Sequence, residues 1–154
     1  MTDRNPDLDR FDRNILAVLA IEGRITVTEL AARVGLSKSP TQARMRRLEA
    51  MGAIRGYRAM LDAVKLGRAH VAFVEVKLSD TRAAALDAFN KAVAKLPEVE
   101  ECHMIAGSFD YLLKVRTRDM PSYRRVMGEK ISALPHVAHT STFVSMEAVK
   151  DEAF

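Results

Sequence analysis

The sequence has very little cysteine, no tryptophan and no long apolar run. Its 154 residues contain one cysteine, so no internal disulfide can form and a reducing compartment is expected. No stretch approaches the roughly 18 consecutive apolar residues that a membrane-spanning helix needs. The apolar fraction of 48% is nevertheless ordinary for a globular chain and allows a core. We therefore expect a cytoplasmic protein with no membrane partner.

Signatures of catalysis and metal binding are also missing. The sequence contains no G-x-S-x-G, H-E-x-x-H, P-loop or Rossmann pattern, and its four histidines are too dispersed for a recognised metal spacing. His103, Asp110 and Tyr111 form the only plausible acid–base group, and nothing in the sequence shows that they converge. We expect no catalytic residue, no metal site and no cofactor, with a small enzyme as the minor alternative.

Positive charge is concentrated in one segment. Between Arg24 and Arg58 the chain has eight basic residues against two acidic ones, whereas residues 63–154 have thirteen against twelve. Such a segment can face the phosphates of DNA, or it can be a solvated helix face. Charge alone does not decide between the two.

Three helices are predicted in the first part of the chain. Apolar residues recur at helical spacing from Leu8 to Ile21. Thr26-Val-Thr-Glu29 is a capping box that begins a second helix, and Gly35 supplies its left-handed stop. Ser37 or Ser39 then caps a third helix. These features predict a helix-turn-helix domain over residues 1–62.

The third helix has the composition of a DNA reader. Two short helices joined by a tight turn, the second rich in arginine, are typical of a helix-turn-helix protein. Hydroxyl, amide and guanidinium groups suit the donor and acceptor pattern of the major groove. Met45, Leu48 and Thr41 are expected to point inward, although Thr41 is kept as a candidate contact. The candidate DNA-contacting residues are Lys38, Ser39, Thr41, Gln42, Arg44, Arg46 and Arg47.

The rest of the chain alternates between strands and helices. After a hinge at 63–68, the order is strand, helix, strand, strand, helix, strand. We expect the strands at 70–78, 99–106, 109–117 and 137–146, and the helices at 82–96 and from Asp119 to Leu134. The pattern Leu-Pro-x-Val at both helix-to-strand junctions supports two related halves. The fold class is therefore α+β, with a winged-helix-like helix-turn-helix domain and a βαββαβ ferredoxin-like domain over residues 69–154.

Packing of this second domain suggests a partner. Helices on one face of four strands leave the other face uncovered, and neither face of the strand at 70–78 is wholly polar. A second copy is expected to cover the open face, which gives a homodimer. Cys102 lies in a predicted strand and is interpreted as a small core residue.

Six segments in order carry a family resemblance. They are LDRFDRNIL (8–16), GRITVTELAARVGLS (23–37), RMRRLEAMGAIRGYRA (44–59), ECHMIAGSFDYLLKV (101–115), YRRVMGEKISALPHV (123–137) and TSTFVSMEAVK (140–150). Together they resemble the Lrp/AsnC family of bacterial and archaeal transcriptional regulators, also called feast/famine regulators.

The resemblance implies double-stranded DNA as the partner of the first domain. It implies that the second domain binds a small-molecule amino-acid effector, either leucine-like, branched-chain or proline, and assembles into dimers, tetramers or octamers. The effector would change assembly or DNA affinity and so control genes of amino-acid metabolism. A nucleoid-associated protein is then expected. An architectural DNA-compacting protein with weak or no effector control is the alternative.

The resemblance also points to an effector site. Residues 106–111 match the family's G-x-x-D segment, in which backbone N–H groups of a glycine turn could hold a carboxylate and Asp110 could hold an ammonium group. Hydroxyls of the last strand, from a neighbouring subunit, could add contacts. The alternative is an ordinary turn with a locally hydrogen-bonded aspartate. The candidate effector-binding residues are Gly107, Ser108, Phe109, Asp110, Tyr111, Thr140, Ser141 and Thr142.

Overall fold

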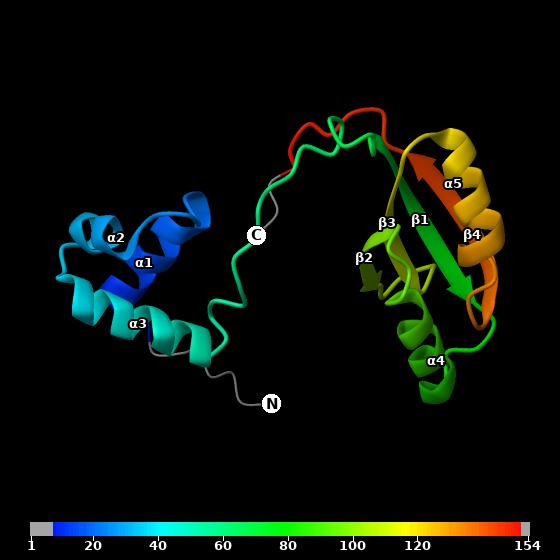
Figure 1. Ribbon diagram of the computed structural model, residues 1–154. Helices are drawn as coiled ribbons and strands as arrows, with labels where there is room; N and C mark the ends of the chain where they lie inside the picture. The colour runs from blue at the N-terminus through cyan, green and yellow to red at the C-terminus, as the bar shows by residue number, and fades with distance from the viewer. Residues whose placement is uncertain (1–7, 152–154) are drawn as a thin grey trace. The chain divides into compact units, whose positions relative to one another are not determined.

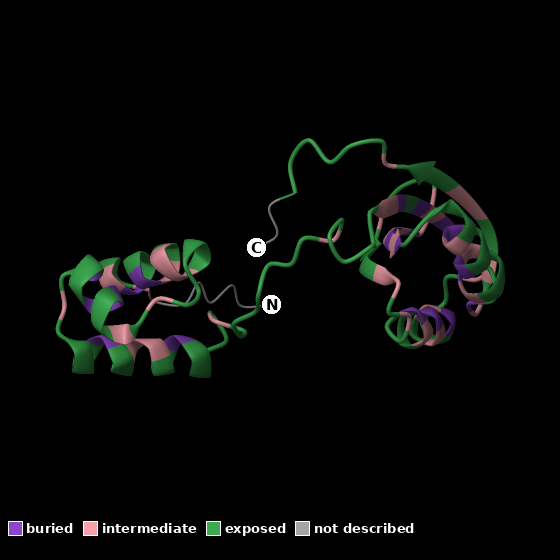
Figure 2. Cartoon of the chain, turned by 45° about the horizontal axis from the view of Figure 1, so that its top comes forward, coloured by how far each residue is buried: buried purple, intermediate pink, exposed green. Residues whose placement is uncertain are grey.

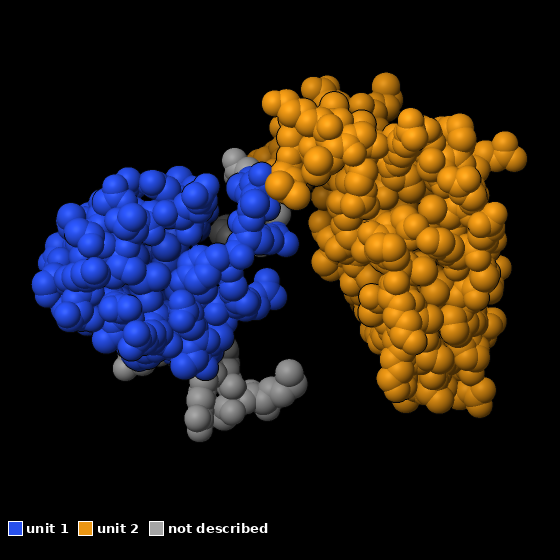
Figure 3. Space-filling model, viewed as in Figure 1, with its two compact units in different colours: residues 1–60, 153–154 blue, residues 61–152 orange. Residues whose placement is uncertain are grey.

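The computed structural model describes residues 8–151, which divide into two compact units (Figures 1 and 3). Unit 1 extends to Met60 and unit 2 begins at Leu61, slightly earlier than the hinge expected at 63–68. That segment is an ordered turn of unit 2. The Asp62 carboxylate accepts the backbone N–H of Val64 at 3.0 Å, and the N–H of Arg68 donates to the carbonyl of Ala63 at 2.8 Å.

Unit 1 consists of α1 (Arg10–Ile21), α2 (Val27–Val34) and α3 (Lys38–Ala50). The apolar stripes of the three helices meet in a core of Ile15, Leu30, Val34 and Leu48. Each such side chain stabilises the fold by about 1.5–3 kcal/mol when it leaves water. The three helices and the inward direction of Leu48 confirm the sequence-based prediction.

The first two helices begin with capping boxes. The Thr26 hydroxyl accepts the backbone N–H of Glu29 at 3.2 Å, and the Glu29 carboxylate accepts the N–H of Thr26 at 3.2 Å, as predicted. Asp9 and Asp12 form a second box at the start of α1. This box was not predicted from the sequence, because an aspartate in place of glutamate departs from the usual pattern.

The turn between α2 and α3 has the predicted geometry. Gly35 has φ 74°, in the left-handed region, and the N–H of Leu36 donates to the carbonyl of Ala31 at 2.9 Å. Helix α3 then begins at Lys38, so Ser37 is its N-cap residue. Ser39 lies inside the first turn, and its candidacy as a cap was therefore wrong.

Unit 2 contains β1 (His70–Leu78), α4 (Ala83–Val93), β2 (Val99–Met104), β3 (Tyr111–Thr117), α5 (Met120–Val126), the π-helical segment η1 (Met127–Ile131) and β4 (Val137–Val144). The four strands form one antiparallel sheet in the order β2-β3-β1-β4. This order is the predicted ferredoxin-like plan (Figure 1).

The sheet is apolar on the face that its helices cover. Phe89 of α4 and Val126 of α5 pack into one core with Val74 and Leu113, which are direct neighbours in the β1–β3 register. Alternation along the strands places the remaining side chains on the other face. We call it the open face, and it is formed by Val71, Phe73, Glu75, Lys77, Leu112, Lys114, Arg116, Ser141 and Phe143.

The open face is not buried within one chain. Phe73 and Phe143 are direct cross-strand neighbours, with 37% and 55% of their surfaces exposed. The expected burial of β1 on both faces is therefore not met by the single chain. Residues 8–151 leave this face partly exposed.

Cys102 corrects one expectation. It lies on β2, an edge strand, and is exposed rather than part of the core. An alternating strand pattern shows which face a residue occupies, but it does not show whether the strand has a neighbour on both sides.

The two halves of unit 2 share a turn. The N–H of Val99 donates to the carbonyl of Leu96 at 3.1 Å, and the N–H of Val137 donates to the carbonyl of Leu134 at 3.3 Å. Each Leu-Pro-x-Val segment thus closes on the same backbone hydrogen bond, although His136 has φ 63° and the equivalent Glu98 does not have a positive φ. The helix expected to continue to Leu134 is instead α-helical only as far as Val126 and then becomes η1.

Candidate functional site

The outward face of α3 carries four of the candidate DNA contacts. Lys38, Ser39, Gln42 and Arg46 are all exposed, and Figure 2 shows this helix with a continuous exposed side. Thr41 lies on the opposite side and is fully buried, with its hydroxyl donating to the carbonyl of Ser37 at 2.9 Å. Its place among the candidate contacts was wrong, because an inward-facing side chain cannot reach a base.

Arg44 is held against the start of α1. Its Nη1 atom lies 2.6 Å from Asp9 Oδ2 and 2.8 Å from Asp12 Oδ1. Its guanidinium carbon lies 5.4 Å from the centre of the Phe11 ring. Hydrogen bonds to these carboxylates raise the pKa of Arg44 further above its ordinary value. With 26% of its side chain exposed, Arg44 is a partly buried cation that spans two helices.

Asp12 is the centre of this ion-pair cluster. Its side chain is fully buried, and its second oxygen accepts Arg47 Nη1 at 3.0 Å. Arg47 keeps half of its side chain exposed. A role for Asp12 was not predicted from the sequence. The only local signal is that Asp9 and Asp12 are three positions apart, as are their partners Arg44 and Arg47.

A second contact fixes the segment that follows α3. The Tyr57 hydroxyl donates to Glu49 Oε1 at 2.9 Å. Partial burial and the neighbouring carboxylate raise the pKa of Tyr57 to about 12. Residues 55–60 contain no helix or strand and are exposed, so the basic side chains of Arg55 and Arg58 lie on the surface.

The hairpin turn places part of the candidate effector site. The N–H of Ile105 donates to the carbonyl of Asp110 at 2.9 Å and closes the turn, and Gly107 and Ser108 are exposed at its tip. The Asp110 carboxylate accepts the backbone N–H of Leu78 at 2.8 Å and Lys77 Nζ at 3.1 Å.

These contacts define the charge state of Asp110. The Leu78 N–H, followed by Lys77, lowers the pKa of its carboxyl, so the group is ionised near neutral pH. Each of its oxygens already has a donor within the chain. This geometry matches the alternative of a locally hydrogen-bonded aspartate, and any contact with an effector would be additional to it.

The other candidate effector residues are divided between two faces. Tyr111 is buried with its ring centre 4.4 Å from that of Phe89, and the Thr142 hydroxyl lies 2.6 Å from the Tyr123 hydroxyl. Thr140 and Thr142 share the helix-covered face, whereas Ser141 lies on the open face. Phe109, in the turn, is half-buried. One chain does not bring all eight residues together.

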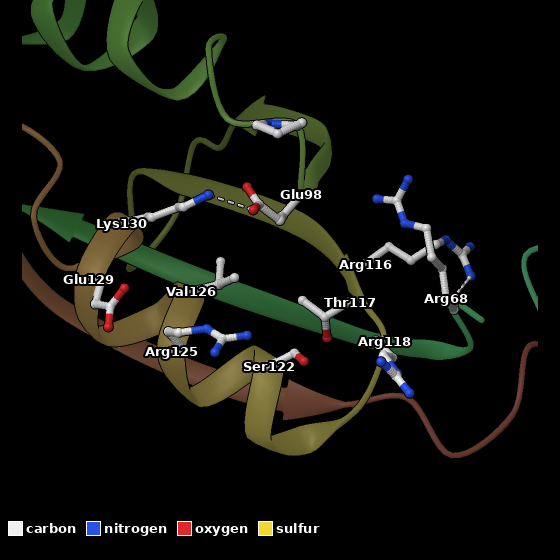
Figure 4. A pocket seen from close by; sticks show the side chains of 11 residues that line it. Arg68, Glu98, Arg116, Thr117, Arg118, Ser122, Arg125, Val126, Glu129 and Lys130 are labelled. Atoms are coloured by element: carbon white, nitrogen blue, oxygen red, sulfur yellow. Dashed lines mark hydrogen bonds and ion pairs between the residues drawn. The ribbon is translucent and has the colours of Figure 1, made fainter. Parts of the chain in front are cut away.

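The structure has a cavity that the sequence analysis did not predict (Figure 4). It has a volume of about 390 Å³ and lies between α5–η1, the end of β3 and the turn before β2. Its lining includes Arg68, Glu98, Arg116, Arg118, Arg125 and Lys130. These residues are scattered along the chain and form no motif, so sequence spacing could not have revealed them.

Over residues 8–151, no group of three His, Cys, Asp or Glu side chains is placed to hold a metal ion. No helix in this range is long and apolar enough to cross a bilayer.

Known proteins resemble both units. The Lrp/AsnC ligand binding domain matches residues 71–153, and a winged helix-turn-helix DNA-binding domain matches residues 8–55. The proline dehydrogenase transcriptional activator of Rhodobacter capsulatus is 61% identical over 145 residues, which cover 94% of each chain. The leucine-responsive regulatory protein of Escherichia coli K12 is 49% identical over 144 residues, or 94% of this chain and 88% of the relative.

A solved structure agrees over nearly the same length. A transcriptional regulator from Neisseria meningitidis in complex with L-methionine has a TM-score of 0.88, with 32% identity and 94% of each chain covered. The three similar proteins are named as a transcriptional activator, a regulatory protein and a transcriptional regulator.

Proposed function

Because the chain belongs to the Lrp/AsnC family of transcriptional regulators, we propose that α3 binds specific duplex DNA and that an amino acid controls this binding through unit 2. Names of relatives point to proline and leucine, and a structural neighbour holds methionine. A leucine-like, branched-chain or proline effector and genes of amino-acid metabolism fit these names. The protein would then act on the nucleoid.

The exposed face of α3 is the observation that carries the DNA-binding proposal. Arg44 and Arg47 both contact Asp12, so part of their hydrogen-bonding capacity is used within unit 1. Arg46 is exposed on the same helix, with Gln42 one turn before it. An arginine can bind guanine through two hydrogen bonds and a glutamine can do so with adenine. Lys38, at the start of the helix, is suited to phosphate.

A first prediction concerns Arg46. Duplexes selected from a random pool by the full-length protein would supply the binding site, and fluorescence anisotropy would measure its affinity. Arg46→Ala should weaken binding by at least about tenfold, because a bidentate base contact contributes about 1–3 kcal/mol. If Arg46 contacts phosphate instead, the substitution should reduce the slope of the logarithm of the binding constant against the logarithm of salt concentration by about 0.9.

Arg124→Ala is the matched control for that measurement. Arg124 is an exposed arginine in the last turn of α5, so the substitution removes the same charge from unit 2. Its affinity for the selected duplex should stay within about twofold. If the Arg46→Ala variant and the unaltered protein bind the duplex with equal affinity, the assignment of α3 to the DNA interface is wrong.

For the effector, we propose a site at the hairpin turn, where Gly107, Ser108 and Asp110 lie together. Phe109 would flank it from the same turn. A second copy would bring Ser141 toward the site from its open face, while Thr140 and Thr142 would act from the helix-covered side. The buried Tyr111 would support the turn rather than touch the ligand.

A second prediction tests this site by calorimetry against all twenty amino acids. Asp110→Asn keeps an oxygen for the Leu78 N–H but removes the charge that an ammonium group would face. It should weaken binding of the active amino acid by about tenfold. Asp87→Asn, on the exposed side of α4, is the control. If no amino acid binds or changes DNA affinity, the architectural alternative gains support.

Assembly is the remaining part of the proposal. The open face exposes Phe73 and Phe143 side by side, and a symmetric pair of sheets could bury both phenylalanines of each copy. The same face carries a groove of about 760 Å³ beside the segment 145–151. A homodimer through this face, with further association to a tetramer or octamer, fits these features.

A further inference from the structure

The cavity beside α5 and η1 has an excess of positive charge. Five cationic side chains and two carboxylates line it, which leaves an excess of three positive charges. Figure 4 shows the Arg125 guanidinium beside Ser122, with Arg68 and Arg116 at one end and the Glu98–Lys130 pair at the other. Its volume of about 390 Å³ lies within the range of small-molecule sites.

Only some of these cations are paired within the chain. Lys130 Nζ lies 2.6 Å from Glu98 Oε1, and Arg116 Nε lies 2.5 Å from Glu100 Oε1. Arg118 reaches Asp119 only at 4.0 Å and is 81% exposed. For Arg68 and Arg125, no carboxylate of residues 8–151 lies within 4.0 Å of the guanidinium. The positive charge without a close carboxylate partner is therefore centred on Arg68, Arg118 and Arg125, although Arg68 acts at longer range on Glu98 and Arg125 on Asp119.

Glu98 adds an unsatisfied acceptor to the same cavity. Its Oε2 atom is buried and has no hydrogen-bond donor among the described residues. The hydrogen bond from Lys130 lowers the pKa of the Glu98 carboxyl, so the group is a charged acceptor near neutral pH. A buried charged oxygen is unfavourable unless a donor reaches it. A ligand that carries a hydroxyl group would supply such a donor.

We propose that this cavity binds a small phosphate ester that carries hydroxyl groups, separately from both the α3 surface and the hairpin turn. Arg125 holds the phosphate, since the guanidinium fork matches phosphate oxygens, and Arg68 adds positive charge from its end of the cavity. Ser122 adds a hydroxyl beside Arg125, and a hydroxyl of the ligand donates to Glu98 Oε2. The excess of three positive charges favours a phosphate dianion over the single carboxylate of an amino acid.

The backbone of duplex DNA fits the same cavity less well. Deoxyribose within a duplex has no hydroxyl to donate to Glu98, and the Glu98 carboxylate repels a row of phosphates. The proposal therefore does not depend on the DNA-binding function, and either can fail alone.

Calorimetric titration of the full-length protein with ribose 5-phosphate, ribose and inorganic phosphate tests the proposal. Ribose 5-phosphate should bind most tightly, inorganic phosphate more weakly, and ribose should not bind at millimolar concentration. Arg125→Gln should weaken ribose 5-phosphate binding by about tenfold, the effect of losing one charge-assisted hydrogen bond. Arg124→Gln is the matched control, because this neighbouring arginine of α5 does not line the cavity.

A further variant tests the role of Glu98. Glu98→Gln should reduce the preference for ribose 5-phosphate over inorganic phosphate without weakening inorganic phosphate binding. Circular dichroism would show that each variant is folded.

Several results would overturn the proposal. One is the absence of ribose 5-phosphate binding to the unaltered protein at millimolar concentration, and another is an equal effect of Arg124→Gln and Arg125→Gln. Loss of duplex affinity in Arg125→Gln without any ribose 5-phosphate binding would assign the cavity to the DNA backbone. An amino acid that binds through Arg125 while ribose 5-phosphate does not bind would assign it to the effector.

Discussion

Asp12 joins the helix that is proposed to meet DNA to the first helix of the chain. Its buried carboxylate receives Arg44 and Arg47, while Asp9 receives Arg44 from the other side. A buried carboxylate is tolerated only when donors compensate its lost hydration. The same contacts fix the two guanidinium groups in place. They also limit how many N–H donors of each arginine are available to a ligand.

Asp12→Asn should destabilise unit 1 by about 2 kcal/mol. Hydrogen bonds to a charged group contribute about 1.5–3 kcal/mol each, and the partial exposure of both arginines reduces the loss. Urea unfolding, followed by the helical signal, would measure it. Asp87→Asn removes an exposed carboxylate that pairs with Lys91 on α4 and should change the stability by less than about 0.5 kcal/mol. Equal unfolding midpoints for the two variants would contradict the structural role of Asp12.

At this scale the sequence predicts burial better than it predicts pairing. Helical periodicity placed Leu48 and Met45 on the inner side of α3, and both pack against the unit 1 core. It also favoured an inner position for Thr41, which the structure confirms. The Asp12–Arg44 pair joins residues 32 positions apart, and no local pattern reports such a contact.

At the scale of elements, the start of α4 depends on a local ion pair. Asp80 Oδ2 lies 2.6 Å from Arg82 Nη2, and the Asp80 carboxylate also accepts the backbone N–H of Arg82 at 2.9 Å. The Arg82 contacts lower the pKa of Asp80 to about 2. Arg82 is itself the N-cap residue of α4, so the Asp80 side chain holds the loop that leads into this helix.

The Asp80 carboxyl should titrate near pH 2 in the folded protein. Since its pKa is lower in the folded than in the unfolded chain, its contribution to stability is complete above its ordinary value of 3.8 and is lost as the pH falls toward 2. Carbon-13 NMR of the carboxyl group would follow the titration. Arg82→Gln should return the midpoint toward its ordinary value, and an unchanged midpoint in that variant would rule out Arg82 as the cause.

Elements with a strong local pattern could be predicted closely from the sequence. The strand expected at 70–78 is β1 with the same bounds, because alternating apolar residues and turn signals define both ends. The hairpin strands are shorter than expected, because residues 105–110 form the turn. The α-helix expected from Asp119 to Leu134 ends at Val126, since periodicity does not distinguish an α-helix from a π-helical segment.

At the scale of the whole molecule, the open face should decide assembly. Phe143→Asp would place a carboxylate beside Phe73 in the proposed dimer interface, where its hydration would be lost. Sedimentation velocity should show a dimer or larger assembly for the unaltered protein and a smaller species for this variant. Ile21→Asp, at an exposed position of unit 1, should leave the assembly unchanged. If Phe143→Asp leaves the mass unchanged, the open face is not the interface.

The fold of both units followed from patterning, whereas the effector site did not. Strand alternation places Ser141 and Thr142 on opposite faces, so sequence adjacency was a poor guide to a shared site. The cavity at Arg68 and Arg125 draws on segments that meet only in the folded chain.

The π-helical segment makes the two halves of unit 2 differ beside the cavity. Fourteen positions separate the N-cap Arg82 from Leu96, but fifteen separate the N-cap Asp119 from Leu134. One additional residue advances a helix by about 100° unless the backbone widens locally to absorb it. The widened turn contains Glu129 and Lys130, two residues of the cavity wall. The repeated architecture is thus asymmetric by a single extra position, and the cavity borders the point where the repeat is broken.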